Sequence, residues 1–223
     1  MGMLTVIVLT LMTVATVWLL YYSRSLLPRQ MEERTTESVK AFGTAVELRF
    51  PSHKGLSSRV VALSDALARQ LHLSDTMRRD LELAARLRDI GMCSVPYRLV
   101  NEMPPSEWNV ADKAAYLQHA EVGGAMLEKI RELSRLAPIV RYHHARYDGA
   151  DDPTMPCGLS LPMLARILKV VADFVWYERM KGSLIAKEIL KAGRGTAYCP
   201  QAADALLTVL TSTRVEQREH SLV

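Results

Sequence analysis

Four residues of this chain could together form a metal site: Asp89, His119 and the adjacent pair His143 and His144. A carboxylate combined with neutral imidazoles suits Mn, Fe, Zn or Ni. Each residue also has a purely structural explanation, because Asp89 can pair with Arg88 and the histidines can be ordinary helix residues. Adjacent helical side chains point about 100° apart, so His143 and His144 both reach one cleft only if they straddle its axis.

Helices are the elements that must position these residues, because apolar side chains recur with helical spacing along most of the chain. Ser74 is a plausible N-cap, Gly193 and Gly195 mark a helix end, and Pro200 opens the next helix. No alternating strand pattern is present, so we expect an all-α fold. The predicted helices cover about residues 57–71, 74–88, 106–118, 119–134, 136–146, 161–179, 183–192 and 200–213.

The first 23 residues carry no charged side chain, and Leu4 to Leu20 are almost wholly apolar. A run of roughly 20 such residues spans a bilayer as a helix. The alternative is a cleaved signal peptide, which the missing basic start and the missing small-residue cleavage site disfavour. Because Arg24 and Arg29 follow the run closely, the positive-inside rule predicts a single-pass protein of the inner (cytoplasmic) membrane, with its N-terminus outside and its domain in the cytoplasm.

These patterns divide the chain into four predicted parts: a transmembrane anchor at 1–23, a juxtamembrane linker and helix at 24–50, a helical domain at 51–215 and a flexible tail at 216–223. Within the linker, Val39, Phe42, Val46 and Phe50 recur with helical spacing. This stripe either packs on the domain or forms a homodimer contact, and four apolar positions do not decide between the two.

Composition excludes some functions. The three cysteines are an odd number without metal-type spacing, which fits a reducing compartment and argues against a disulfide framework. The net charge is only +4, and no dense run of Lys and Arg interleaved with aromatic residues is present. We therefore expect no nucleic-acid partner.

Several segments together resemble the HD-GYP branch of the HD-domain metal-dependent phosphohydrolases. They are "LRDIGMCSVP" at 87–96, "HAEVGGAML" at 119–127, "IVRYHHARYDG" at 139–149, "LPMLARILKVVADF" at 161–174 and "GTAYCP" at 195–200. The resemblance runs from about residue 41 to 210. It implies an all-α, HD-domain-like helical bundle around a site for two or three metal ions that hydrolyses cyclic di-GMP. With the apolar run at the start, the expected architecture is an N-terminal transmembrane helix followed by this bundle.

Residue by residue, the resemblance places Asp89, His119, His143 and His144 on metal-ligand positions. At four other functional positions the chain departs from the family pattern: Leu56 and Arg88 stand where the family has histidines, Met92 where it has a lysine, and Ala172 where it has an aspartate. Asp173 is displaced by one residue from that aspartate. The Gly-Tyr-Pro signature of the family reads Asp151, Asp152, Pro153 here.

These departures predict a catalytically impaired domain that acts by binding a protein or a nucleotide in cyclic-di-GMP-type signalling, with no cofactor expected. A guanidinium has no lone pair for a metal, and we expect Arg88 to substitute electrostatically for a lost ion next to Asp89. One alternative is an active cyclic-di-GMP phosphodiesterase that uses Mn or Fe and a realigned Asp173. The other is a structural membrane component.

Overall fold

The computed structural model describes residues 2–220, except for the side chains of residues 52 and 213–220. It is helical with no named strand in this range, which confirms the predicted all-α class. Residues 221–223, the end of the predicted tail, lie outside the described part. The helices are α1 (Gly2–Tyr21), α2 (Leu27–Arg49), α3 (Leu56–Gln70), α4 (Asp75–Leu87), α5 (Tyr97–Asn101), α6 (Val110–Glu128), α7 (Ala137–Arg141), α8 (Met163–Lys181), α9 (Ser183–Ala192) and α10 (Pro200–His220).

Short turns of helix connect these elements. One is a π-helical turn, η1 (Tyr22–Leu26), and the others are 3₁₀ turns: η2 (Pro51–His53), η3 (Ile90–Ser94), η4 (Pro105–Glu107), η5 (Ser134–Leu136) and η6 (Gly158–Ser160). The chain divides into two units, residues 1–41 and the part that begins at Phe42.

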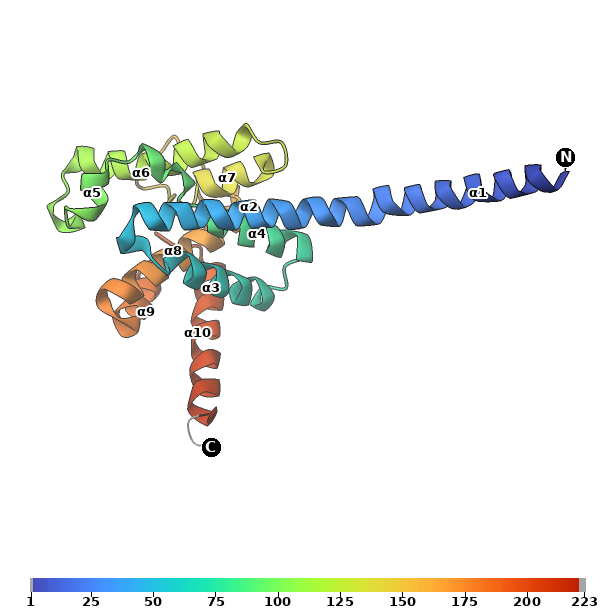
Figure 1. The fold of residues 1–223 in the computed structure, drawn as a ribbon. Coiled ribbons are helices and arrows are strands. Elements are labelled where there is room, and N and C mark those ends of the chain that lie inside the picture. The colour runs from blue at the N-terminus through green and yellow to red at the C-terminus, as the bar shows by residue number, and fades with distance from the viewer. Residues whose placement is uncertain (1, 221–223) are drawn as a thin grey trace. The chain divides into compact units, whose positions relative to one another are not determined.

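The first unit is helical throughout its described residues (Figure 1). Its α1 has 20 residues, none with a charged side chain, and none of them is buried. A helix of this length is about 30 Å long, the thickness of the hydrocarbon core of a bilayer. By length and composition alone, the helix that begins at Gly2 is therefore a candidate membrane span.

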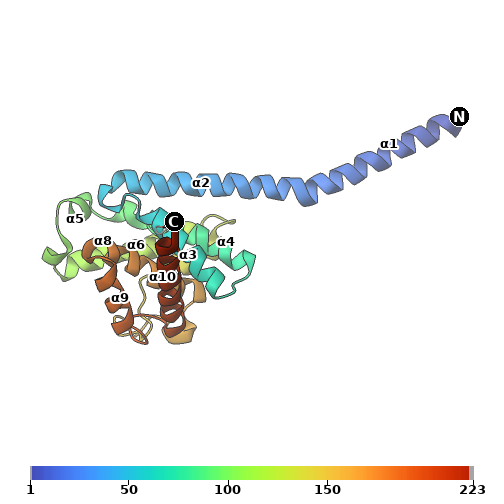
Figure 2. The same ribbon diagram turned by 90° about the horizontal axis from the view of Figure 1, so that it is seen from below.

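The second unit is a helical bundle built around α8 (Figure 1, Figure 2). Helix α3 packs on α4 and α8, α9 packs on α8, and α6 packs on α7 and η3. Helix α8 is central because it is apolar on several sides: Ile167, Leu168, Val170, Val171 and Phe174 are all buried. Helices α4 and α7 pack on each other and both contact α8, and α6 packs on α7.

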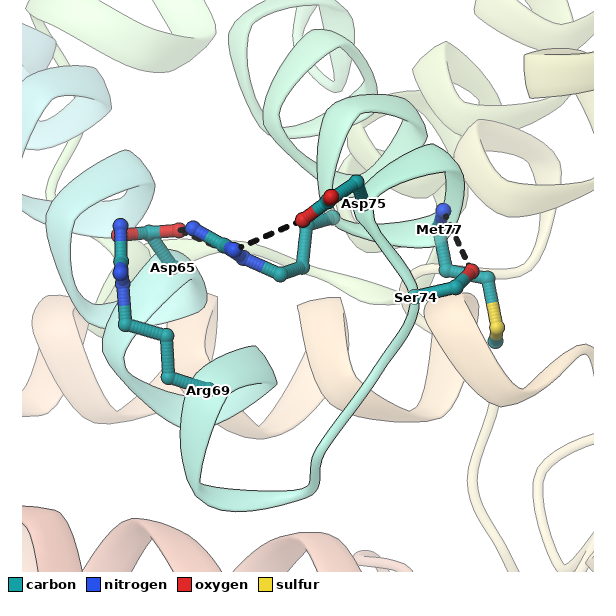
Figure 3. Close-up of polar contacts among 6 residues, drawn as sticks. Asp65, Arg69, Ser74, Asp75 and Met77 are labelled. Atoms are coloured by element: carbon teal, nitrogen blue, oxygen red, sulfur yellow. Dashed lines mark hydrogen bonds and ion pairs between the residues drawn. The ribbon is translucent and has the colours of Figure 1, made fainter.

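The hairpin of α3 and α4 is closed by local polar contacts at its turn (Figure 3). Ser74 is the N-cap of α4 as predicted, and its hydroxyl accepts a hydrogen bond from the backbone N–H of Met77. Asp65 of α3 accepts hydrogen bonds from Arg69 at 2.9 Å and from Arg78 of α4 at 3.0 Å. The hairpin thereby fixes the direction of α4, which places the last residues of this helix at the centre of the bundle.

Two predicted helix boundaries were wrong. The helices expected at 106–118 and 119–134 are one helix, α6, because Asn109 forms a capping box with Asp112 and nothing breaks the helix at His119. The helix expected at 136–146 ends at Arg141, so His143 and His144 lie in the turn that follows. Their side chains are therefore not spaced by the 100° step of a helix.

Gly91 allows η3 to lie directly against α6. A Cβ atom at this position would stand 2.0 Å from the carbonyl oxygen of His119 and 2.5 Å from the backbone N of Gly123. Both are backbone atoms of a helix, which cannot move aside as a flexible side chain can. The missing side chain thus permits the approach that places Asp89 beside His119.

We predict that Gly91→Ala destabilises the domain by about 3 kcal/mol or more, because overpacking must separate η3 from α6. Thermal or denaturant unfolding of the full chain in detergent measures this loss. Gly43→Ala is the matched control: its nearest contact is Arg86 O at 3.2 Å, and alanine favours a helix by up to ~1 kcal/mol. Equal stabilities of the two variants would show that the close approach is not required.

Asp65 should make stability depend on pH. Burial raises its pKa, but hydrogen bonds from Arg69 and Arg78 more than offset this, so its pKa lies below the ordinary value of 3.8. The contribution is therefore present above about pH 4 and is lost as pH falls through the lower, folded-state pKa. At pH 7 we expect Asp65→Asn to lower the free energy of unfolding by less than about 1 kcal/mol, and therefore to lower the melting temperature. At the acid end of the pH series we expect the substitution to have no effect on the melting temperature.

The measurement for this prediction is a series of thermal melts from pH 7 to pH 3. Asp75→Asn is a matched control, because Asp75 also pairs with Arg78, at 3.1 Å, but its side chain is 97% exposed. A deficit of the Asp65 variant that is independent of pH would contradict the assignment.

Candidate functional site

The candidate site begins where α4 ends, with a buried ion pair between neighbouring residues. Arg88 Nη2 lies 2.8 Å from Asp89 Oδ2, and the two residues are only 5% and 9% exposed. Arg88 Nη1 also donates a hydrogen bond to Ala85 O at 2.8 Å. Because the α4 backbone stops at Leu87, Arg88 folds back over the helix end while Asp89 turns toward α6.

The charge of Asp89 is stabilised by this arrangement. Burial by itself raises the pKa of a carboxyl group, but the Arg88 guanidinium, helped by His53 and His119, holds the pKa of Asp89 well below its usual range. Asp89 is therefore ionised at neutral pH. One of its oxygens, Oδ1, also lies 3.7 Å from His119 Nε2.

His119 is fully buried in the middle of α6, and its ring has a fixed orientation. Its Nδ1 lies 2.5 Å from the carbonyl oxygen of Tyr116. A carbonyl can only accept, so Nδ1 carries the proton and Nε2 keeps its lone pair. This Nε2 lies 3.3 Å from His144 Nε2.

His143 is held in the same way by the end of α7. Its Nδ1 lies 2.6 Å from Val140 O, so its Nε2 is also unprotonated when the ring is neutral. Burial lowers the pKa values of His119, His143 and His144, that of His143 to about 3. All three rings are therefore neutral at pH 7, the form that binds metal ions.

The three histidines fit one metal ion. One ring nitrogen from each lies within 4.8 Å of the others. Two nitrogen ligands at ~2.0–2.1 Å from a tetrahedral ion stand about 3.4 Å apart, close to the 3.3 Å between His119 Nε2 and His144 Nε2. The Nδ1–H groups bonded to backbone carbonyls are the kind of outer support that metal-binding histidines normally have.

A second ion has no comparable ligand set among the residues predicted for it. The carboxylate of Asp89 is paired with Arg88. Leu56 and Ala172 line the cavity beside Asp89 but offer no ligand atom. Asp173 also lines it, yet its carboxylate pairs with Lys169 Nζ at 2.9 Å.

The other predicted positions lie elsewhere. Met92 is fully buried in an apolar cluster with Phe50, Val95 and Leu99. Asp151, Asp152 and Pro153 belong to the irregular segment between α7 and η6 and are not among the residues that line the cavity. In that loop Asp152 accepts hydrogen bonds from Thr154.

A cavity of about 210 Å³ adjoins the buried pair, and several of its residues were not predicted from the sequence. These are His53 and three aromatic residues, Trp108, Tyr116 and Trp176. A neighbouring cavity of about 380 Å³ shares these four residues and adds Arg179. The one sequence signal for His53 was its place three residues before Leu56, and the aromatic residues gave no signal because they come from separate elements.

Comparison with known proteins gives the family. The model of the HD domain family matches residues 40–197. The cyclic di-GMP phosphodiesterase response regulator RpfG of Xanthomonas campestris is 28% identical over 186 residues, which are 80% of this chain and 49% of that protein. The 3′3′-cGAMP-specific phosphodiesterase 3 of Vibrio cholerae is 33% identical over 136 residues, 61% of this chain and 29% of that protein.

Solved structures agree on the fold. A cyclic GMP-AMP-specific phosphodiesterase of Vibrio cholerae has a TM-score of 0.65 at 18% identity and covers 80% of this chain and 49% of its own. The protein Bd1817 of Bdellovibrio bacteriovorus has a TM-score of 0.61 at 19% identity and covers 80% of this chain and 64% of its own. The chain thus spans half or less of the length of the curated relatives above. Over most of its own length it belongs to the HD domain family.

Proposed function

We propose that this protein is a catalytically impaired HD-domain receptor that binds a cyclic dinucleotide in the cavity beside Asp89. The observation that carries the proposal is the buried Arg88–Asp89 pair, at 2.8 Å. A two-metal hydrolase needs a carboxylate that is free to bridge its two ions, with further lone-pair donors on both sides of that carboxylate. In this chain the guanidinium of Arg88 occupies one side of the Asp89 carboxylate.

Arg88 acts against a second ion in two ways. Its guanidinium stays protonated and offers no lone pair, and its positive charge repels a divalent cation held at Asp89. Its 5% exposure means that water screens this repulsion poorly. The same charge would attract a phosphate group that enters the cavity.

The cavity has the chemistry to hold a nucleotide. Bases stack on aromatic rings, and Trp108, Tyr116 and Trp176 line both adjoining cavities. Arg88 faces one cavity and Arg179 the other, so a phosphodiester would meet a guanidinium in either. The names of the relatives, phosphodiesterases for cyclic di-GMP and 3′3′-cGAMP, support a cyclic dinucleotide as the ligand.

A single ion fits the proposal, held by His119, His143 and His144. A bound divalent ion would supply positive charge to a phosphate oxygen and lower the pKa of a coordinated water. The residues of the chain do the rest: backbone carbonyls fix two imidazoles, and Arg88 holds Asp89 ionised.

We also propose that α1 anchors the protein in the inner membrane with the HD domain in the cytoplasm. The support is the length and apolar composition of α1 and the position of Arg24 and Arg29 just after it. A receptor fixed there would respond to a cytoplasmic nucleotide at the membrane surface.

The second candidate function is an active phosphodiesterase. The intact cluster of three neutral histidines favours it, because such a cluster is what a hydrolytic metal ion requires. Turnover, not binding, separates the two functions.

We predict that the full chain in detergent binds cyclic di-GMP or 3′3′-cGAMP and hydrolyses neither in the presence of Mn²⁺ or Fe²⁺. Calorimetry measures binding, and chromatography of the nucleotides measures turnover. Trp176→Ala should weaken binding about 5- to 150-fold, since stacking contributes ~1–3 kcal/mol per base. Tyr177→Ala is the matched control, because Tyr177 is the next residue of α8 and does not line either cavity. Metal-dependent turnover would establish the second function instead.

A further prediction concerns metal content. We expect at most one ion per chain, and Arg88→His should not raise this to two, because Leu56 and Ala172 still supply no ligand. Elemental analysis of protein purified without oxygen and without chelator gives the stoichiometry. Two ions per chain in the single variant would show that Arg88 alone had prevented the second site.

A further inference from the structure

An apolar groove of about 500 Å³ lies between the C-terminal part of α2, η3 and the end of α6. It shares no lining residue with the two cavities of the candidate site. Phe50 and Leu127, which line it, are fully buried, whereas Phe42, Met126 and Ile130 are 48%, 39% and 40% exposed. The groove therefore has a closed apolar floor and open apolar walls.

The elements around this groove are held in place. Phe50 belongs to the buried apolar cluster described above. The carboxylate of Glu47 accepts a hydrogen bond from the backbone N–H of Gly55 at 3.3 Å, which ties the end of α2 to the start of α3. Cys93 Sγ of η3 lies 3.9 Å from Met126 Sδ of α6. The groove is thus a feature of the packed domain that begins at Phe42.

The charge at the groove is positive. Among the described residues that line it, the charged ones are two exposed cations, Arg49 and Lys129. The guanidinium carbon of Arg49 lies 5.3 Å from the centroid of the Phe50 ring, at the edge of the floor. Glu128, the neighbour of Lys129, is paired with Arg141 at 2.8 Å. An occupant with an apolar body and a negative end complements this arrangement.

The size of the groove favours a small molecule over a protein. A stable protein interface takes about 20–30 residues from each side, whereas eleven residues line this groove. Its volume of about 500 Å³ falls within the ~300–1,000 Å³ of small-molecule sites. Methionine, present here as Met126, adapts its flexible thioether to an alkyl chain.

We propose that this groove binds the anion of a free, single-chain fatty acid. The alkyl chain lies against Phe42, Met126 and Ile130, and the carboxylate lies beside Arg49 and Lys129. The inference is independent of the proposed function, because it requires neither the histidine cluster nor a nucleotide in the cavity beside Asp89.

The wild-type chain carries its own reporter. Cys93 is exposed and lines the groove, and Cys157 is exposed but does not line it. The test is alkylation of the full chain by iodoacetamide in nanodiscs of a zwitterionic lipid, without detergent, followed by mass spectrometry of the cysteine peptides. We expect dodecanoate to slow alkylation of Cys93 in a saturable way and to leave the rate at Cys157 unchanged.

The length and charge of the amphiphile separate its two ends. Burial of each methylene contributes about a four-fold gain in affinity, so octanoate, with a chain four methylenes shorter, should require a concentration about 10-fold higher or more. Dodecyltrimethylammonium has the same chain length with a positive head, and it should not protect Cys93 at the concentrations at which dodecanoate does.

Two pairs of variants locate the site. Arg49→Gln should weaken protection by dodecanoate about 2- to 5-fold, the range of an exposed ion pair, and Arg131→Gln, an exposed arginine outside the groove, should not. Ile130→Gln should weaken it about 3-fold or more, because it removes an apolar wall. Leu184→Gln is the matched control, since Leu184 is 75% exposed and lies on α9.

Each other outcome overturns the proposal. Equal slowing at Cys93 and Cys157 would mean adsorption without a site, and equal protection by the cationic amphiphile would mean that charge plays no part. Protection without fatty acid in nanodiscs of an anionic phospholipid would identify a bilayer lipid as the occupant. Protection without any amphiphile, only when two chains share a nanodisc, would identify a second copy of the chain.

Discussion

The buried ion pair between Arg88 and Asp89 is the interaction on which the character of this site depends. Two buried charges 2.8 Å apart must be kept together, because removing either one leaves an uncompensated charge that costs ~3–5 kcal/mol. The pair therefore fixes the charge of the cavity at the end of α4. Any ligand that reaches Asp89 must be compatible with a permanent guanidinium beside it.

The histidine side of the site is independent of this pair. His119 comes from α6, and His143 and His144 come from the turn after α7, and backbone carbonyls within the same elements fix two of the rings. Their geometry depends on the packing of α6 on α7 and of η3 on α6 across Gly91. A substitution at the end of α4 can thus change the charge of the cavity while the imidazoles keep their positions.

Much of the fold could be predicted from the sequence, because local signals mark its elements. Ser74 caps α4 as expected, and α9 has the predicted bounds of 183–192. The helix boundary predicted near His119 was wrong, because an apolar pattern alone does not show whether two successive segments form one helix or two. The four candidate ligands were identified by type and by resemblance, whereas His53 was missed, because its burial and its unpaired nitrogen result from tertiary packing between η2 and α8.

The uneven distribution of polar groups around the cavity is the strongest argument that the cavity still binds a ligand. Apolar side chains already fill two places, at Leu56 and Ala172, so the fold tolerates such replacements. Three neutral imidazoles, two buried and one half-buried, with ring nitrogens within 4.8 Å of one another are a costly arrangement if they serve only packing, since apolar residues would fill the same volume without polar atoms to satisfy. Their presence beside a guanidinium, and with His53 facing the same space, is explained if the cavity binds one ion and an anionic ligand together.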